Sequence, residues 1–169
     1  MRKICILVLL VVFGLAAKAQ TSIPKAQSMF IYNFSRLIEW PEKYRSGDFK
    51  IGVLGSNELY DELTGYTTGK KVGTQNISVE KYKEPAEINN CHILFVAFGK
   101  SNKMAEITSK VNSSSTLIIS EKKGTIDEGA CINFLIVGNS LKFELKPSNA
   151  LSAGLKLSPK LNEMAVEVF

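Results

Sequence analysis

Few side chains of this sequence have the types and spacing that enzyme catalysis requires. His92 is the only histidine. Because it lies inside an apolar run, we expect a buried structural residue rather than a general base. The segment from Gly65 to Lys71 resembles a phosphate loop, but it has one residue too few between its glycines and lacks the metal-binding hydroxyl. No spacing of carboxylates selects an acid–base pair. We therefore expect no catalytic residue, no cofactor and no enzyme activity.

Cys91 and Cys131 are the only cysteines beyond the first 19 residues, so at most one internal disulfide bond can form there. Such a bridge would close a loop of about 40 residues and could stabilise the fold by about 4 kcal/mol. The alternative is that each is a small buried residue opening an apolar strand. The sequence leaves both open, because it does not show whether the two Cα atoms lie within about 7 Å. Metal-ligand spacing is missing, so we expect no metal site.

Two loops could hold an anion. Ser56 and Asn57 follow one apolar run, and Lys100 and Ser101 follow another. At the carboxyl ends of parallel strands, loops that lead into helices point backbone N–H groups toward a ligand. These four residues are therefore the candidates for small-ligand binding.

The N-terminal segment has the pattern of an export signal. A short basic start at Arg2 and Lys3 precedes an apolar run from Ile4 to Ala17, and an A-x-A cleavage pattern ends at Ala19. The run is shorter than the roughly 20 apolar residues that a membrane span needs. We therefore predict a removed signal peptide at residues 1–19, a mature chain over 20–169, a periplasmic location and no stable membrane insertion.

The charge balance argues against nucleic acid as a partner. The whole chain has 21 basic and 16 acidic residues, a formal net charge of +5. Loss of Arg2, Lys3 and Lys18 with the signal peptide leaves 18 basic residues against 16 acidic ones. So small an excess does not indicate a phosphate-binding surface.

Hydrophobic periodicity predicts alternating helices and strands. Helical spacing marks 25–40, 58–64, 102–111, 150–155 and 159–168, and apolar or alternating runs mark strands at 49–54, 77–82, 91–98, 116–120, 132–137 and 141–145. Strand–helix–strand repetition favours right-handed parallel crossovers, whereas the turn at 138–140 favours an antiparallel hairpin. We predict an α/β fold: a single domain with a mixed, mostly parallel sheet, a terminal antiparallel hairpin and helices on both faces.

Seven segments together resemble the YfiR-like family, also called DUF4154. They are FIYNFSRLIEWP (30–41), FKIGVLG (49–55), CHILFVAF (91–98), TLIIS (116–120), GACINFLIV (129–137), LKFEL (141–145) and LSAGLKLSPKLNEMA (151–165). Their order and spacing cover nearly all of the chain that follows the predicted signal peptide.

The resemblance implies a small periplasmic α/β protein without catalytic residues. For the best-known member it implies a dimeric repressor that binds the periplasmic part of an inner-membrane diguanylate cyclase, in cyclic-di-GMP signalling. An outer-membrane lipoprotein sequesters that repressor. Other relatives accompany membrane histidine kinases. The expected partners are therefore an inner-membrane signalling protein, an outer-membrane lipoprotein and a second copy of the chain.

Two functions remain open at this stage. A regulator that binds a sensor domain needs an exposed apolar patch, for which Leu155, Leu157, Leu161 and Met164 are the candidates. Core packing would explain the same four residues equally well. The alternative is a periplasmic small-ligand-binding protein that uses the loops at Ser56 and Lys100.

Overall fold

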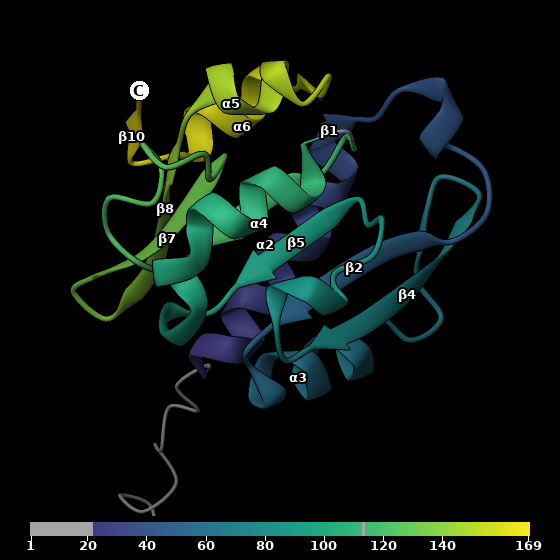
Figure 1. The fold of residues 1–169 in the computed structure, drawn as a ribbon, viewed down its shortest axis with the longest axis horizontal. Helices are drawn as coiled ribbons and strands as arrows, with labels where there is room; N and C mark the ends of the chain where they lie inside the picture. The colour runs from purple at the N-terminus through teal and green to yellow at the C-terminus, as the bar shows by residue number, and fades with distance from the viewer. Residues whose placement is uncertain (1–21, 113) are drawn as a thin grey trace, which may run out of the picture.

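The computed structural model describes residues 22–112 and 114–169. The predicted signal peptide lies outside this part of the chain. Figure 1 shows a central twisted sheet with helices packed against it. Within the described residues, no helix has the length and apolar character that a membrane span requires.

The sheet has eight strands in the order β10-β8-β7-β6-β5-β2-β4-β3. Their bounds are β2 Phe49–Leu54, β3 Lys71–Val72, β4 Gln75–Tyr82, β5 Ile93–Val96, β6 Leu117–Ser120, β7 Ile132–Val137, β8 Ser140–Leu145 and β10 Glu167–Val168. Strands β4, β2, β5, β6 and β7 are parallel, and β7 and β8 form the antiparallel hairpin. The predicted mixed, mostly parallel sheet with a terminal hairpin is confirmed.

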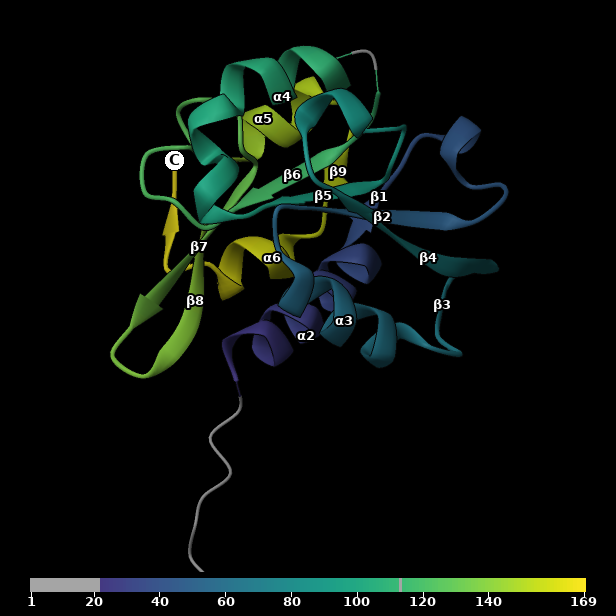
Figure 2. The same cartoon turned by 60° about the horizontal axis from the view of Figure 1, so that its bottom comes forward.

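Helices cover both faces of this sheet, as predicted (Figure 2). Their bounds are α2 Ile23–Leu37, α3 Asn57–Thr67, α4 Met104–Val111, α5 Pro147–Ser152 and α6 Pro159–Met164. Helices α2, α3 and α6 lie on one face, and α4 and α5 lie on the other. Short 3-10 helices occur at Glu42–Tyr44, Pro85–Glu87 and Phe98–Lys103.

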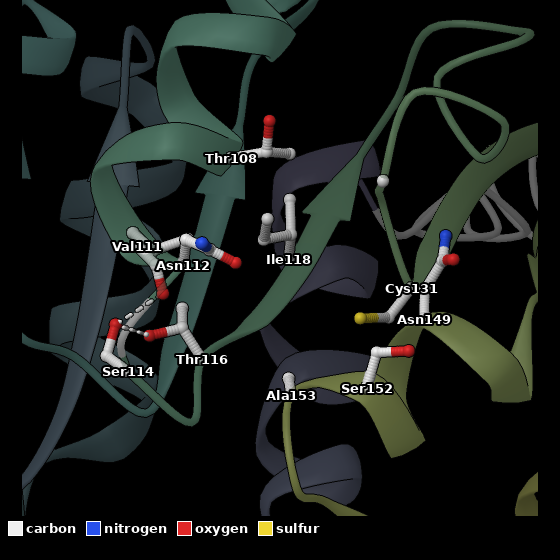
Figure 3. A pocket seen from close by; sticks show the side chains of 11 residues that line it. Thr108, Val111, Asn112, Ser114, Thr116, Ile118, Cys131, Asn149, Ser152 and Ala153 are labelled. Carbon is white, nitrogen blue, oxygen red and sulfur yellow. Dashed lines mark hydrogen bonds between the residues drawn. The ribbon is translucent and has the colours of Figure 1, made fainter.

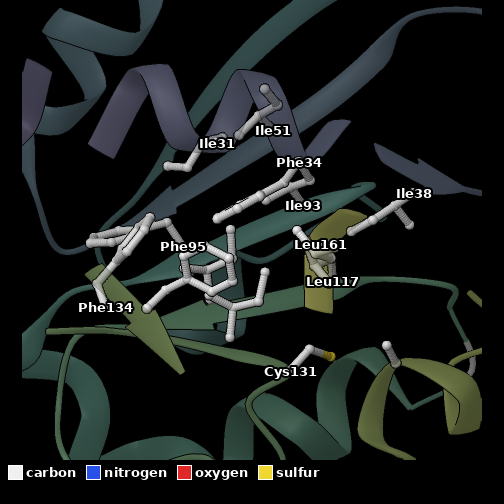
Figure 4. Packing of buried hydrophobic residues seen from close by; sticks show 14 of the residues in the cluster. Ile31, Phe34, Ile38, Ile51, Ile93, Phe95, Leu117, Cys131, Phe134 and Leu161 are labelled. Atoms are coloured by element: carbon white, nitrogen blue, oxygen red, sulfur yellow. The ribbon is translucent and has the colours of Figure 1, made fainter. Parts of the chain in front are cut away.

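The central strands are apolar on both sides because each face is covered. All four residues of β5 and of β6 are buried, as expected for parallel strands between two helical layers. On the α2 side, Phe34 packs against Phe143, with ring centroids 4.9 Å apart. Figure 4 shows this cluster around Phe34, Phe95 and Phe134. On the opposite side, Met104 and Ile107 of α4 are fully buried in a second cluster.

The first helix ends earlier than its periodicity predicts. Helix α2 stops at Leu37, and Ile38–Glu39 form a two-residue strand, β1. This strand pairs antiparallel with β9 (Lys156–Leu157), and the backbone N–H of Ser158 donates to the carbonyl of Leu37 over 2.9 Å. The helical spacing continues through Ile38, but the backbone of Ile38 pairs with Leu157 of β9 instead of continuing the helix.

The predicted strand at 91–98 is also shorter in the structure. Strand β5 ends at Val96, and Phe98 begins a 3-10 helix with 64% of its surface exposed. The two C-terminal helices end at Ser152 and Met164, and the chain then adds β10 to the sheet edge.

Candidate functional site

The loops expected to bind an anion use their polar groups within the fold. The Ser56 hydroxyl accepts the Leu59 N–H over 3.2 Å and so caps α3, while the neighbouring Asn57 is exposed. Ser101 is fully buried, and its hydroxyl donates to the Ala97 carbonyl over 3.1 Å. The hydroxyl groups of Ser56 and Ser101 are therefore used within the fold.

Lys100 is likewise engaged by a carboxylate. Its Nζ lies 2.6 Å from Glu84 Oε1, and Lys103 Nζ lies 2.7 Å from Glu84 Oε2. Hydrogen bonds from these two ammonium groups lower the pKa of Glu84 to about 2. Glu84 thus offsets one of the two positive charges and occupies both ammonium groups, so Lys100 already has a partner from the same protein.

The four C-terminal residues expected to form a partner-binding patch divide into two groups. Leu155 and Leu161 are fully buried in the main core, so for these two residues the structure shows the core-packing alternative and not an exposed patch. Leu157 lies in β9 and Met164 lies at the end of α6; both are only partly buried. Leucine spacing alone could not distinguish these two environments.

Cys91 and Cys131 are free, buried thiols, so the disulfide considered from the sequence is not formed. Cys91 precedes β5 and Cys131 precedes β7, and β6 lies between these strands. Two inter-strand spacings amount to about 9.5 Å, beyond the roughly 7 Å that a disulfide spans. Burial raises the pKa of Cys91 to about 12 and that of Cys131 to about 11.

His92 has the structural role expected of it. Its Nδ1 accepts the Lys50 backbone N–H over 3.0 Å, its Nε2 lies 2.8 Å from the Tyr44 carbonyl oxygen, and its ring stacks on Phe49 at 4.3 Å. Burial lowers the pKa of His92, and an imidazolium could not accept the Lys50 hydrogen bond. In the described residues no cluster of three His, Cys, Asp or Glu could hold a metal ion.

A hollow of about 170 Å³ lies between α4, α5 and strand β6. Figure 3 shows Thr108 and Asn112 on one side, Asn149 and Ser152 on the other, and the thiol of Cys131 directed toward the interior. The lining has no charged side chain. Several of its hydroxyl groups donate to main-chain carbonyls. Thr108 donates to Met104, Ser114 to Val111, Thr116 to Cys91 and Ser152 to Ser148.

A larger hollow lies on the opposite face of the sheet, between α2 and α6. It has a volume of about 430 Å³ and is lined by Asn33, Arg36, Leu37, Lys160 and Met164. A second hollow of about 280 Å³ shares Arg36 and Leu37 with it and continues along β1 and β9. We call the larger of these two hollows the α2–α6 groove. It combines two cations with two apolar side chains, and the larger hollow has no carboxylate in its lining.

Exposed apolar side chains lie on the same face of the sheet, near its β8 edge. Ile136 and Val168 are about half exposed, at 52% and 47%, and Val166 is 50% exposed. Ile136 is paired with Leu141, and Val168 with Leu145. Because paired residues share a face, Ile136 and Val168 lie on the side that α2 and α6 cover, and Val166 precedes β10 with its N–H donating to the Phe143 carbonyl. We call Ile136, Val166 and Val168 the edge patch.

The residues of the groove give only a weak signal in the sequence. Asn33 and Arg36 occur at helical spacing on α2, and Lys160 precedes Met164 by one turn on α6. Exposed charges at such spacing usually indicate a solvated helix face, and the pairing of α2 with α6 is a tertiary contact. Of the five residues that line the larger hollow, only Met164 was predicted as a site residue.

This fold defines a small α/β protein whose candidate sites are a groove and an apolar edge. The sequence profile of the YfiR/HmsC-like family, DUF4154, matches residues 24–166. The chain therefore belongs to this family of periplasmic regulatory proteins, as the resemblance of its segments predicted. No curated protein matches the sequence.

Two solved structures show the same fold at low sequence identity. A conserved domain protein from Vibrio cholerae has a TM-score of 0.60 and 8% identity, and the match covers 88% of this chain. An ABC domain from Streptococcus pneumoniae, in complex with L-Trp, has a TM-score of 0.59 and 12% identity over 86% of this chain. The match spans only 60% of each of those chains. At these identities the similarity concerns the fold alone.

Proposed function

We propose that this protein is a non-enzymatic periplasmic regulator that binds and represses the periplasmic sensor part of an inner-membrane signalling protein, a diguanylate cyclase or a histidine kinase. Family membership supports the regulatory class. The observation that supports protein binding is the edge patch, where Ile136 on one side of β8 and Val166 and Val168 on the other side are each about half exposed.

The edge patch is suited to a protein partner for two reasons. Burial of exposed apolar side chains against a partner removes them from water and lowers the free energy of the complex. The strand β10, which carries Val168 and begins directly after Val166, has only two residues and forms the end of the sheet. The outer edge of β8 between Ser140 and Lys142 faces no strand within the described chain. A partner can therefore contact the apolar side chains of the edge patch and the free backbone edge of β8.

Repression follows if the regulator binds one state of the receptor better than the other. A ligand shifts a two-state equilibrium only by its difference in affinity for the two states. A regulator that binds the inactive sensor about 100-fold more tightly would stabilise that state by about 2.7 kcal/mol. No covalent chemistry by the regulator is needed.

The proposal is tested by crosslinking and affinity capture of the tagged protein from intact cells, followed by mass spectrometry. We expect an inner-membrane diguanylate cyclase or histidine kinase to be recovered with the wild-type protein. The double variant Val166→Asp/Val168→Asp places two charges in the edge patch and should lose this partner. The control variant Leu151→Asp changes a side chain that is 62% exposed on α5, on the other face, and should retain it.

Two results would overturn the proposal. Equal recovery of the signalling protein with both variants would show that the edge patch is not its binding surface. Recovery of no membrane signalling protein, under conditions that capture another periplasmic complex, would argue against the regulator itself. Circular dichroism of the purified variants establishes that each one is folded before capture is compared.

A further inference from the structure

The α2–α6 groove places two cations in one hollow without a carboxylate to neutralise them. Arg36 is exposed near the end of α2, and Lys160 is exposed near the start of α6. Some cations of this protein are ion-paired, such as Lys100 and Lys103 with Glu84. Within the described chain, neither Arg36 nor Lys160 lies within 4.0 Å of a carboxylate oxygen. Their charges are therefore available to a ligand.

The guanidinium of Arg36 is partly held in place. Its Cζ lies 5.8 Å from the ring centroid of Tyr32, one turn earlier on α2. The ammonium group of Lys70 lies 5.0 Å from the same centroid. Contact with an aromatic face restricts a guanidinium while leaving its N–H groups free to donate. The planar group can then bind a carboxylate or phosphate through two parallel hydrogen bonds.

The remaining wall of the hollow is apolar. Leu37 and Met164 line it beside the two cations, and both also pack against the main core. A methionine side chain adapts its shape to an apolar group, and Asn33 adds an amide that can donate or accept. A volume of about 430 Å³ lies within the range of roughly 300–1,000 Å³ typical of small-molecule sites.

We propose that the α2–α6 groove binds a small amphiphilic anion, a carboxylate or phosphate carried on a short apolar chain. Arg36 and Lys160 contact the anionic group, and Leu37 and Met164 contact the chain. A purely inorganic anion would leave the apolar wall exposed to water. An uncharged apolar molecule would leave both cations without a counterion. The groove therefore selects a ligand that has both parts.

The α2–α6 groove and the two loops that the sequence predicted as a ligand site lie at different places in the fold. The loops at Ser56 and Lys100 lie after β2 and β5, at the carboxyl ends of the parallel strands, and their polar groups are engaged. The groove is formed by helices on one face of the sheet and depends on no strand end. The site is also separate from the edge patch, so it stands independently of the proposed partner.

The test is a titration of the ¹⁵N-labelled mature protein with sodium octanoate, kept below its micelle-forming concentration and followed by two-dimensional NMR. We expect saturable shifts centred on Asn33, Arg36 and Met164. Sodium acetate and octanol, which each supply one half of the ligand, should bind much more weakly. The double variant Arg36→Gln/Lys160→Gln should weaken octanoate binding about tenfold, because two surface ion pairs together supply an effect of that size.

A matched control uses Lys110→Gln/Lys122→Gln, which removes two cations that do not line the groove. This variant should bind octanoate as the wild type does. Equal affinity in both double variants, equal binding of octanol, or saturable shifts centred elsewhere would overturn the proposal. Vesicles of phosphatidylglycerol distinguish the source of the anion. Binding to vesicles with no saturable response to octanoate would assign the cations to a lipid surface and reject the free ligand.

Discussion

At the scale of single residues, the hydrogen bonds of His92 require its neutral state. Nδ1 accepts the Lys50 N–H, and Nε2 donates to the Tyr44 carbonyl, which also accepts Gln75 Nε2 over 3.1 Å. The histidine and the glutamine thus hold the segment around Tyr44 against β2. Since burial lowers the pKa of His92 in the folded state, protonation opposes folding.

The stability should therefore depend on pH in a definite direction. The contribution of His92 is fully present above the unfolded pKa of about 6.5. It is lost as the pH falls below that value toward the lower folded pKa, with a slope of up to about 1.4 kcal/mol per pH unit. Urea denaturation at pH 7.5 and pH 5.0 measures this loss. A His92→Gln variant should lose less stability over the same interval, because His92 is the only histidine.

An unchanged pH dependence in the His92→Gln variant would contradict this account. The carboxylate with the most lowered pKa, Glu84, does not interfere. Its pKa of about 2 in the fold lies below the ordinary carboxyl value, so its contribution is lost only in more acidic solution.

The two buried cysteines provide a second residue-scale prediction. When the protein is purified without a reducing agent and then unfolded, both cysteines should react as free thiols. In the folded protein at pH 7, neither should react with a maleimide. The reason is that burial both excludes the reagent and raises the pKa of Cys91 and Cys131 above 10. Alkylation in guanidinium chloride followed by mass spectrometry measures this. A protein with no free thiols after unfolding would show that the bridge forms.

At the scale of elements, strands were the most predictable part of this protein. The ranges 49–54 and 132–137 match β2 and β7 at both ends, because each is a compact, largely apolar run that a glycine residue follows. The end of α2 was predicted less well, because the segment at Ile38 pairs with Lys156–Leu157. Such pairing depends on residues far along the chain and leaves no local signal.

The candidate sites show the same limit more clearly. Serine and lysine residues in loops after strands have a general association with anions, but the partners of Ser101 and Lys100 come from the fold itself. The groove, by contrast, joins Arg36 and Lys160 from opposite ends of the described chain. Its chemistry exists only once α6 packs beside α2, and single-sequence patterns do not describe that contact.

Two glycines test how local geometry supports the elements. Gly138 lies in the hairpin turn at a φ of +60°, and a Cβ there would meet no atom within 4 Å. Gly129 has a φ of +110°, and its Cβ would lie 2.7 Å from Thr108 Cγ2 on α4. Gly138→Ala should cost about 1 kcal/mol of unfolding free energy, from the left-handed backbone alone.

Gly129→Ala should cost clearly more, about 3 kcal/mol, because overpacking adds to the backbone strain. Thermal and urea unfolding of the two variants measures the difference. Similar destabilisation by both substitutions would contradict the close approach of this loop to α4. A Thr108→Ser exchange, which removes the crowded methyl group, should recover part of the loss in the Gly129→Ala protein.

At the scale of the whole molecule, the two faces of the sheet have different characters. The face covered by α4 and α5 carries a small uncharged hollow that contains Cys131. The face covered by α2 and α6 carries the basic groove and, at its β8 edge, the apolar edge patch. We therefore assign recognition of other molecules to the second face.

The measurement that tests this central claim most directly is site-specific photocrosslinking in intact cells. Val168, in the edge patch, and Leu151, on the opposite face, are each replaced by p-benzoylphenylalanine in otherwise identical proteins. The account predicts that Val168 crosslinks to an inner-membrane diguanylate cyclase or histidine kinase and that Leu151 does not. Crosslinking of such a protein from Leu151 alone, or from neither position, would contradict it.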